Sequence, residues 1–199
     1  NPYPADLFEV NTHATEIHAQ YPGKEFKNVS LAGRIMSRRI MGNASFAELQ
    51  DESGRIQIYL RRDDLCPSED KSFYNIVFKK LLDIGDIIGI TGFVFTTQTG
   101  EVSIHITSLR LLSKSLRPLP VVKETTDEKG NVIVHDAFTD PEQRYRMRYV
   151  DLVVNPHVRD AFMKRTQMVN SMREYLNQQG YLEVETPILQ PLYGGAAAK

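Results

Sequence analysis

Apolar and polar residues alternate along five stretches in the first 112 residues, and turn-forming residues separate the stretches. Alternation with a period of two predicts strands that bury one face. The predicted strands cover 29–40, 45–51, 55–62, 86–97 and 101–112. Apolar residues recur at helical spacing over 72–83, which predicts a helix between the third and fourth strands. A weaker periodic stretch predicts a short helix over 14–21.

The order strand, strand, strand, helix, strand, strand is typical of the OB-fold, a five-stranded Greek-key barrel that binds oligonucleotides or oligosaccharides. Alternation also predicts the face on which each side chain lies. The side chains expected in the core are those of Ala47, Leu49, Ile56, Ile58, Leu60, Val102, Ile104 and Ile106. Those expected on the outer face are Phe46, Glu48, Gln50, Arg55, Gln57, Tyr59, Arg61, Glu101, Ser103, His105 and Thr107.

The second half of the chain has a different pattern, with a hairpin and two helices. Val121 to Lys123 and Val132 to Val134 flank turn-forming residues and predict the hairpin. Asp140 and Asn155 each precede a proline, which predicts two N-caps and helices over 142–153 and 156–179. Gly180 is expected to end the second helix, and 181–184 is expected to form a strand.

These patterns divide the chain into four parts. Residues 1–28 are expected to form an arm with a short helix, 29–113 the barrel, 114–140 a linker with the hairpin, and 141–199 the beginning of a second domain. A single strand leaves its backbone groups unpaired, and the sequence begins without methionine. We therefore expect a truncated second domain and a chain that is part of a longer protein.

Composition restricts the classes of function. Apolar residues make up 41 % of the chain, and 24 Lys and Arg oppose 25 Asp and Glu, so any contact with nucleic acid must be local. The one cysteine excludes an internal disulfide and a multi-cysteine zinc site, which favours the cytoplasm. No apolar run approaches the roughly 20 residues of a membrane span. His105 has no second histidine at ligand spacing, and we expect no bound metal.

The residues with binding chemistry cluster in the predicted barrel. Arg38 and Arg39 end the first strand close to Phe46, and an arginine beside an exposed ring suits an unstacked base. Gln57 and Glu101 carry groups that can select a base edge. The alternative is structural: Phe46 fills the barrel, and the arginines, Gln57 and Glu101 are solvated surface residues. No phosphate loop, GxGxxG or hydrolase motif is present, so the chain shows binding residues and no catalytic ones.

The motifs themselves resemble a known family. The segments are Gly33-Arg34, Arg38-Arg39-Ile40-Met41-Gly42, Ser45-Phe46, Leu49-Gln50-Asp51, Gly54-Arg55-Ile56-Gln57, Thr99-Gly100-Glu101 and Leu116-Arg117-Pro118-Leu119-Pro120. Together they resemble the anticodon-binding domain of bacterial-type lysyl-tRNA synthetases. The segment 144–152 is similar to the interdomain segment of that family, 180–187 to motif 1 of class II synthetases, and 194–199 to its lysine-type continuation.

The resemblance implies roles for individual residues. The central anticodon base, a uridine, would stack on Phe46 and be read by Arg39, Gln57 and Glu101, with Arg38 beside them. Pro187 would lie at a homodimer interface formed by motif 1. Gly194, Gly195 and Ala196 would border the lysine pocket.

The resemblance also implies an enzyme that activates lysine with ATP and Mg2+ and esterifies tRNA(Lys). Motifs 2 and 3, which hold ATP and magnesium in the family, are absent from the 199 residues. We therefore expect this portion to be inactive alone and to bind no cofactor. Three alternatives stay open: a non-catalytic OB-fold module for single-stranded nucleic acid, a dimerisation or regulatory fragment, and a sibling aspartyl- or asparaginyl-tRNA synthetase.

Overall fold

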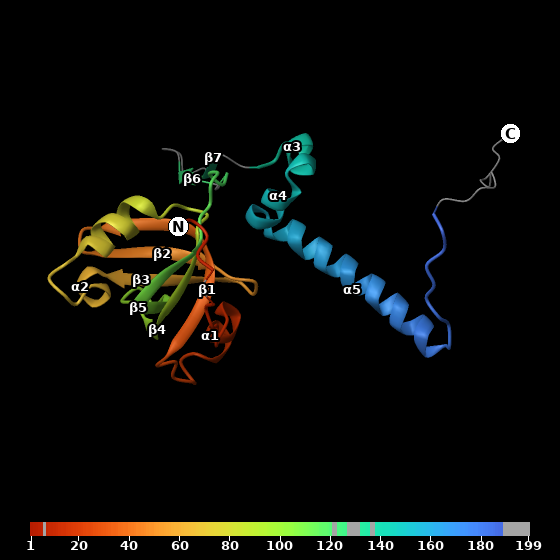
Figure 1. The fold of residues 1–199 in the computed structure, drawn as a ribbon, viewed down its shortest axis with the longest axis horizontal. Helices are drawn as coiled ribbons and strands as arrows, with labels where there is room; N and C mark the ends of the chain where they lie inside the picture. Colours follow the sequence, from red (N-terminus) through yellow and green to blue (C-terminus); the bar gives the residue numbers. More distant parts are fainter. Residues whose placement is uncertain (6, 121–122, 127–131, 136–137, 189–199) are drawn as a thin grey trace. The chain divides into compact units, whose positions relative to one another are not determined.

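A computed structural model describes residues 1–5, 7–120, 123–126, 132–135 and 138–188 (Figure 1). The chain forms two compact units, residues 1–123 and 124–199. Among the described residues, no helix has the length and apolar character needed to cross a membrane.

The first unit is a closed barrel of five strands. The strands are β1 (Val29–Met41), β2 (Ala44–Gln50), β3 (Arg55–Arg61), β4 (Ile87–Thr96) and β5 (Val102–Ser113). They are hydrogen-bonded in the order β1-β2-β3-β5-β4, and β4 pairs back onto β1. Only the β3–β5 pair is parallel. Two short helices, α2 (Arg62–Leu65) and the π-helix η1 (Phe73–Leu81), connect β3 to β4. The predicted OB-fold is confirmed.

The core of the barrel contains the residues that alternation predicts. All eight predicted side chains belong to it, seven of them buried and Val102 partly buried. Tyr74 and Phe78 of η1 add two fully buried rings, stacked 5.6 Å apart. The Tyr74 hydroxyl forms a 2.7 Å hydrogen bond with Ser45 on β2, so η1 is joined to the barrel by a polar contact as well.

The N-terminal segment belongs to the barrel and is not a separate arm. Ala14 and Ile17 of α1 (Ala14–Gln20) are fully buried in the same core, together with Phe26. The Asp51 carboxylate, in the β2–β3 turn, accepts a 2.7 Å hydrogen bond from the backbone N–H of Ala14. The core therefore extends beyond the expected boundary at residue 28. In Figure 1, α1 and η1 cover different sides of the same barrel.

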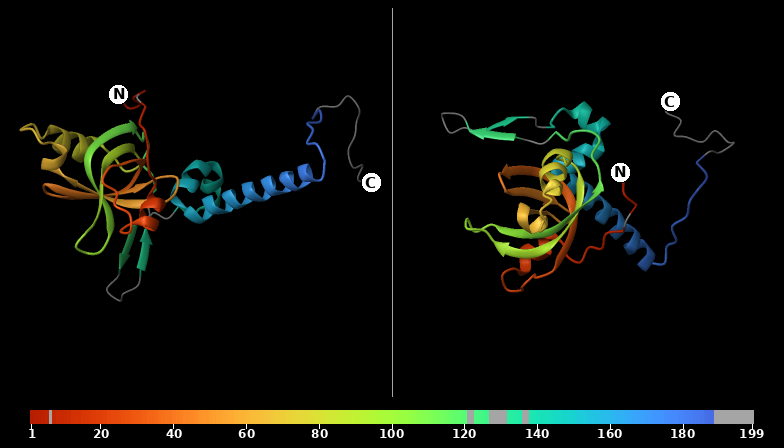
Figure 2. Two further views of the ribbon diagram at one scale, coloured as in Figure 1. Left: turned by 90° about the horizontal axis from the view of Figure 1, so that it is seen from below. Right: turned by 60° about the vertical axis from the view of Figure 1, so that its left-hand side comes forward.

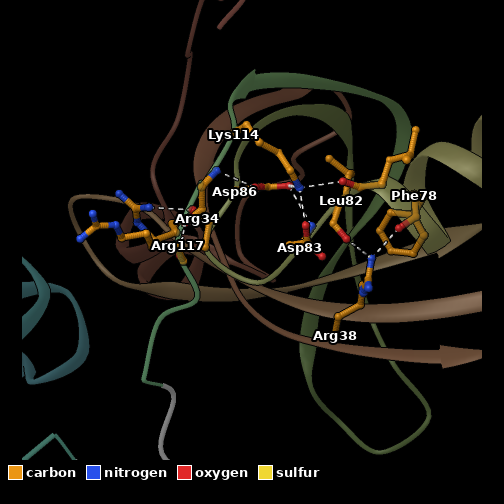
Figure 3. A network of polar contacts seen from close by, with 11 residues as sticks. Arg34, Arg38, Phe78, Leu82, Asp83, Asp86, Lys114 and Arg117 are labelled. Atoms are coloured by element: carbon orange, nitrogen blue, oxygen red, sulfur yellow. Dashed lines mark hydrogen bonds and ion pairs between the residues drawn. The ribbon is translucent and has the colours of Figure 1, made fainter. Parts of the chain in front are cut away.

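A polar network joins the end of η1 to the residues before β4 and to Lys114, which directly follows β5 (Figure 3). The Lys114 ammonium donates to Leu81 O, Asp83 and the fully buried Asp86, at 2.6–2.8 Å. Burial opposes the charge of Lys114, but the carboxylates of Asp83 and Asp86 outweigh it and raise the pKa of Lys114.

The second unit begins with a hairpin and continues with three helices. The hairpin of β6 (Lys123–Thr126) and β7 (Val132–His135) is confirmed for the described residues; Val121 and Val122, with which its first strand is predicted to begin, lie outside them. The helix predicted over 142–153 is divided at Met147 into α3 (Pro141–Arg146) and α4 (Arg148–Val154). A long helix, α5 (Pro156–Gln178), follows after Asn155 and is uninterrupted along its length (Figure 2).

The two predicted N-caps behave differently. Asp140 accepts a 2.8 Å hydrogen bond from Gln143 N, as an N-cap does. Asn155 does not cap α5 through its side chain. Its amide instead donates to Phe138 O and to the fully buried Asp151, which also accepts from Arg144 and Arg148. Asn155 therefore starts α5 as predicted, through its backbone carbonyl, while its side chain belongs to the polar network of Asp151.

Gly180 ends α5 as predicted. It adopts a φ of 86°, a left-handed conformation that glycine adopts without steric cost. Its N–H bonds to Asn177 O and that of Tyr181 bonds to Leu176 O, which is a Schellman motif. The strand predicted over 181–184 is wrong for the described part of the chain, because residues 181–188 form neither strand nor helix.

Candidate nucleic-acid interface

A groove of about 830 Å³ lies on the outer face of the barrel. It is lined from β1, β2, β3 and the β4–β5 connection. The lining residues are Ser37, Arg39, Met41, Phe46, Ala47, Glu48, Arg55, Ile56, Gln57, Tyr59, Phe95, Thr97, Gln98, Thr99 and Glu101. Four of the five predicted anticodon-binding residues line this groove: Arg39, Phe46, Gln57 and Glu101.

Strand pairing brings three of these residues, Arg39, Phe46 and Gln57, onto one face of the sheet. Directly opposed residues on neighbouring strands lie on the same face of a sheet. Arg39 on β1 is opposite Phe46 on β2, and Phe46 is opposite Tyr59 on β3. One pair further along, Glu48 is opposite Gln57, and Gln57 is opposite Ser103 on β5. The outer face therefore has a row with a cation and two rings beside a row of polar groups.

Phe46 is a surface ring and not a core residue. It is partly exposed and is absent from the core cluster. Its ring centroid is 5.0 Å from that of Tyr59, which in turn packs 5.8 Å from Phe95. The alternative that Phe46 fills the barrel is wrong, because Ala47 and Ser45 on either side are the inward-facing residues.

The two arginines at the end of β1 have separate environments. The guanidinium of Arg38 donates to Phe78 O at 2.5 Å and Leu82 O at 2.6 Å, at the C-terminal end of η1 (Figure 3). It also lies over the Phe78 ring. Arg38 thus lies away from the groove that it is expected to join. Arg39 is exposed and lines the groove.

An irregularity in β1 explains this difference. The pairing of β1 with β2 shifts by one residue between Ile35 and Ser37, so one extra residue is inserted at Met36. Such a bulge exchanges the two faces of the following residues. Arg38 consequently lies opposite the inward-facing Ala47, and Arg39 lies opposite Phe46.

Gln57 is held by Ser103 of β5, and Glu101 is held by Thr97 of the β4–β5 connection. The Gln57 amide nitrogen donates to Ser103 Oγ at 2.9 Å. Ser103 is fully buried, although alternation predicts it on the outer face, because Gln57 and Phe95 flank it on the neighbouring strands. Thr97 bonds to the backbone of Glu101 in both directions, which leaves the exposed Glu101 carboxylate at the rim.

Several groove residues lacked an assignment from sequence. Arg55 bonds to Glu48 at 3.2 Å and to Gln50 at 2.8 Å along one edge. Tyr59 and Phe95 extend the aromatic surface beyond Phe46. Alternation signals the outward position of Tyr59, but Phe95 belongs to a strand so apolar that alternation does not separate its faces.

His105 lies beside the aromatic row, outside the groove lining. Its Nε2 is 2.9 Å from the Asp64 carboxylate, and its ring lies 5.1 Å from Tyr59 and 4.8 Å from Phe93. No cluster of three or more potential metal ligands occurs among the residues that the structure describes.

The remaining predicted site residues lie in the second unit. Pro187 is exposed, and so are its apolar neighbours Val184 and Ile188. Gly194, Gly195 and Ala196 lie outside the described residues.

Comparisons with known proteins match the barrel and the second unit to two different families. Residues 29–112 match the family of OB-fold nucleic acid binding domains. Residues 140–199 match the class II tRNA synthetases of the D, K and N type.

Similar proteins carry the name lysine–tRNA ligase. Those of Porphyromonas gingivalis and Christiangramia forsetii are 59 % identical over 202 and 199 residues, and that of Azobacteroides pseudotrichonymphae is 56 % identical over 200. Each match covers all of this chain, but only 34 % of the first two proteins and 39 % of the third. The chain thus spans about a third of the length of its relatives. It belongs to the class II lysyl-tRNA synthetase family and comprises the OB-fold anticodon-binding domain and the start of the class II synthetase domain.

Proposed function

We propose that the groove on the barrel binds the anticodon loop of a lysine tRNA. The observation that carries this proposal is the convergence of Arg39, Phe46, Gln57 and Glu101 in one groove, although 62 residues separate the first from the last. The ring of Phe46 offers a stacking platform, which is how OB-folds hold unpaired bases. Because Arg39, Gln57 and Glu101 line the same groove, we assign them to the edge of a base stacked on that ring.

Each polar group has a distinct role in this proposal. Arg39 can only donate hydrogen bonds, and the Glu101 carboxylate can only accept them. The side-chain amide of Gln57 offers its oxygen as an acceptor, because its nitrogen already donates to Ser103. A uracil edge has two carbonyl acceptors and one N–H donor between them, so a groove with both donors and acceptors suits a central uridine.

We infer the activity of the whole protein from its relatives named lysine–tRNA ligase. That protein would activate lysine with ATP, in the presence of Mg2+, and esterify tRNA(Lys) in the cytoplasm. We assign no described residue to ATP or Mg2+. The anticodon domain contributes selection: it gives the correct tRNA a higher affinity than tRNAs with another central base.

A homodimer through the segment around Pro187 is part of the proposal. The exposure of Leu182, Val184 and Ile188 supports it, because neighbouring apolar side chains at a surface mark interaction sites. Analytical ultracentrifugation of the 199-residue chain tests it. We expect a dimer that dissociates in the variant Ile188→Asp; a monomer at every concentration would refute this part.

Titration with RNA tests anticodon binding. The chain is titrated with four stem-loops of lysine tRNA that differ only at the central anticodon base, at two salt concentrations. We expect the uridine stem-loop to bind most tightly, and the preference for uridine to persist at higher salt, because base contacts specify sequence whereas phosphate contacts mainly position the RNA. Equal affinity for all four would refute anticodon recognition and favour the unspecific single-strand module.

A further inference from the structure

We propose that Ser103 is a positioning residue that fixes the direction of the Gln57 side-chain amide, so that the amide oxygen faces the groove. This inference rests on the proposed function, because it concerns how the groove distinguishes one central base from another. Ser103 itself does not line the groove.

The hydrogen bonds around Ser103 define the direction of the amide. The Ser103 hydroxyl contacts two groups, the Gln57 amide nitrogen at 2.9 Å and the backbone oxygen of Glu101 at 3.4 Å. A carbonyl oxygen can only accept, so the hydroxyl donates its proton to Glu101 and accepts from Gln57. The Gln57 nitrogen is therefore directed to Ser103 and its oxygen away from it.

Burial and strand pairing keep Ser103 in place. Its side chain is fully buried, and its backbone pairs with Gln57 on β3 and with Phe95 on β4. Glu101 O, which accepts the Ser103 proton, also accepts from Thr97 N at 2.9 Å. The group that orients Gln57 is thus a paired residue of β5, anchored to the β4–β5 connection through Glu101, and not a mobile surface side chain.

A fixed amide favours uracil over cytosine. Uracil has an N–H donor at N3, which can bond to the Gln57 oxygen, whereas N3 of cytosine is an acceptor. A freely rotating amide would turn its nitrogen toward cytosine and bind either base. The bond to Ser103 removes this option, so cytosine leaves two acceptors facing each other. Selectivity of this kind arises from penalising the wrong ligand.

The test is the ratio of dissociation constants for stem-loops with central cytidine and central uridine. In Ser103→Ala we expect this ratio to fall by about tenfold, the effect of one hydrogen bond, mainly because the cytidine stem-loop binds more tightly. Ser103→Thr keeps the hydroxyl and should restore the ratio. Ser103→Cys fills a similar volume, but its thiol is only a weak donor and acceptor. This variant should therefore show part of the fall in the ratio, even if the alanine variant folds poorly.

Two further variants separate positioning from a general structural role. In Gln57→Glu both side-chain oxygens accept, so the direction of the group no longer matters. Adding Ser103→Ala to this variant should therefore leave the ratio at the value of Gln57→Glu alone. The matched control is Ser45→Ala, which removes another fully buried serine whose hydroxyl bonds to Tyr74 inside the barrel. It should lower the unfolding temperature and leave the ratio as in the wild type.

The outcomes distinguish this inference from the proposed function. An unchanged ratio in folded Ser103→Ala overturns the role of Ser103 while anticodon recognition stands. The same conclusion follows if both stem-loops lose affinity equally and in proportion to lost stability. A wild-type chain that binds all four stem-loops equally overturns the proposed function, and the inference with it.

Discussion

At the scale of single residues, binding and folding depend on different faces of the same strand. On β2, Ala47 and Leu49 are buried in the core, and Ala47 also borders the groove, whereas the side chains of Phe46 and Glu48 are partly exposed in it. Phe46 packs with Tyr59 on the outer face and does not belong to the core. A substitution at position 46 should therefore affect the ligand much more than the fold.

We predict that Phe46→Ala weakens binding of the uridine stem-loop by about 1–3 kcal/mol, the usual contribution of a base stacked on an aromatic side chain. Its free energy of unfolding should fall by about 1 kcal/mol, because the variant loses one exposed aromatic pair. Fluorescence titration and urea unfolding measure the two quantities. Phe78→Ala is the matched control: that ring is fully buried, and its loss should cost about 3–5 kcal/mol of stability.

Arg38 and Arg39 should give opposite results although they are adjacent. Arg38→Ala leaves two carbonyls at the end of η1 without their donor, so we expect a loss of about 1–3 kcal/mol in stability and an unchanged preference among central bases. Arg39→Ala should reduce that preference and leave stability within about 0.5 kcal/mol. Loss of base preference in Arg38→Ala would contradict this assignment.

The separation of these two arginines could not be predicted from the sequence. Strict alternation from Ile35 would place position 39 on the core side, and the extra residue at Met36 reverses this order. A bulge of this kind has no compositional signal in β1, because Met36 and Ser37 are ordinary strand residues. Where β2 and β3 are regular, alternation alone predicted the apolar inward residues, although it did not single out the fully buried Ser45.

At the scale of elements, one carboxylate joins α1 to the β2–β3 turn. Asp51 accepts hydrogen bonds from the backbone of Ala14, Ser53 and Gly54 at 2.7–2.8 Å, and from the Ser53 hydroxyl. Burial alone would raise the pKa of Asp51, but these donors outweigh burial and hold the pKa below its ordinary value. The ring of His13 is 3.7 Å away and favours the charged carboxylate when protonated.

The stability of the barrel should therefore depend on pH through Asp51. Because its pKa is lower in the folded state, the contribution is fully present above the unfolded pKa of about 3.9 and is lost as the pH falls through the folded pKa. We predict that Asp51→Asn lowers stability by about 1–3 kcal/mol at pH 7. Urea unfolding at intervals between about pH 6 and 2 should show the difference from wild type decreasing with acidification. A difference that stays constant with pH would contradict this prediction.

Helix boundaries in the second unit show which local signals suffice. Asp140 and Gly180 act through their own backbone surroundings, and both were predicted correctly. Asn155 precedes a proline as Asp140 does, yet its side chain donates a hydrogen bond to Asp151. That role depends on a buried carboxylate, which pairs with Arg144 of α3 and Arg148 of its own helix and cannot be recognised from periodicity.

At the scale of the whole molecule, the two units have separate cores. The core of the first combines the five strands with α1 and η1, whereas Phe138, Val150 and Val154 form a small core in the second. The sequence predicts a linker over 114–140, and the two units meet at residues 123 and 124. The contribution of residues 1–28 was missed, because a single helical turn or two with few apolar residues gives no indication of what it packs against.

The N-terminal segment should thus be required for a stable barrel. Ile17 and Phe26 are buried in its core, and burying each such side chain contributes about 1.5–3 kcal/mol. Deletion of residues 1–28 should therefore cost about 3–6 kcal/mol, and more through the lost partner of Asp51, against a typical total of about 5–15 kcal/mol. Residues 1–123 should instead unfold in one transition at the denaturant midpoint that the barrel shows in the full chain. Circular dichroism during urea unfolding measures both. If residues 29–113 alone matched that midpoint, α1 would be an accessory to the barrel rather than part of its core.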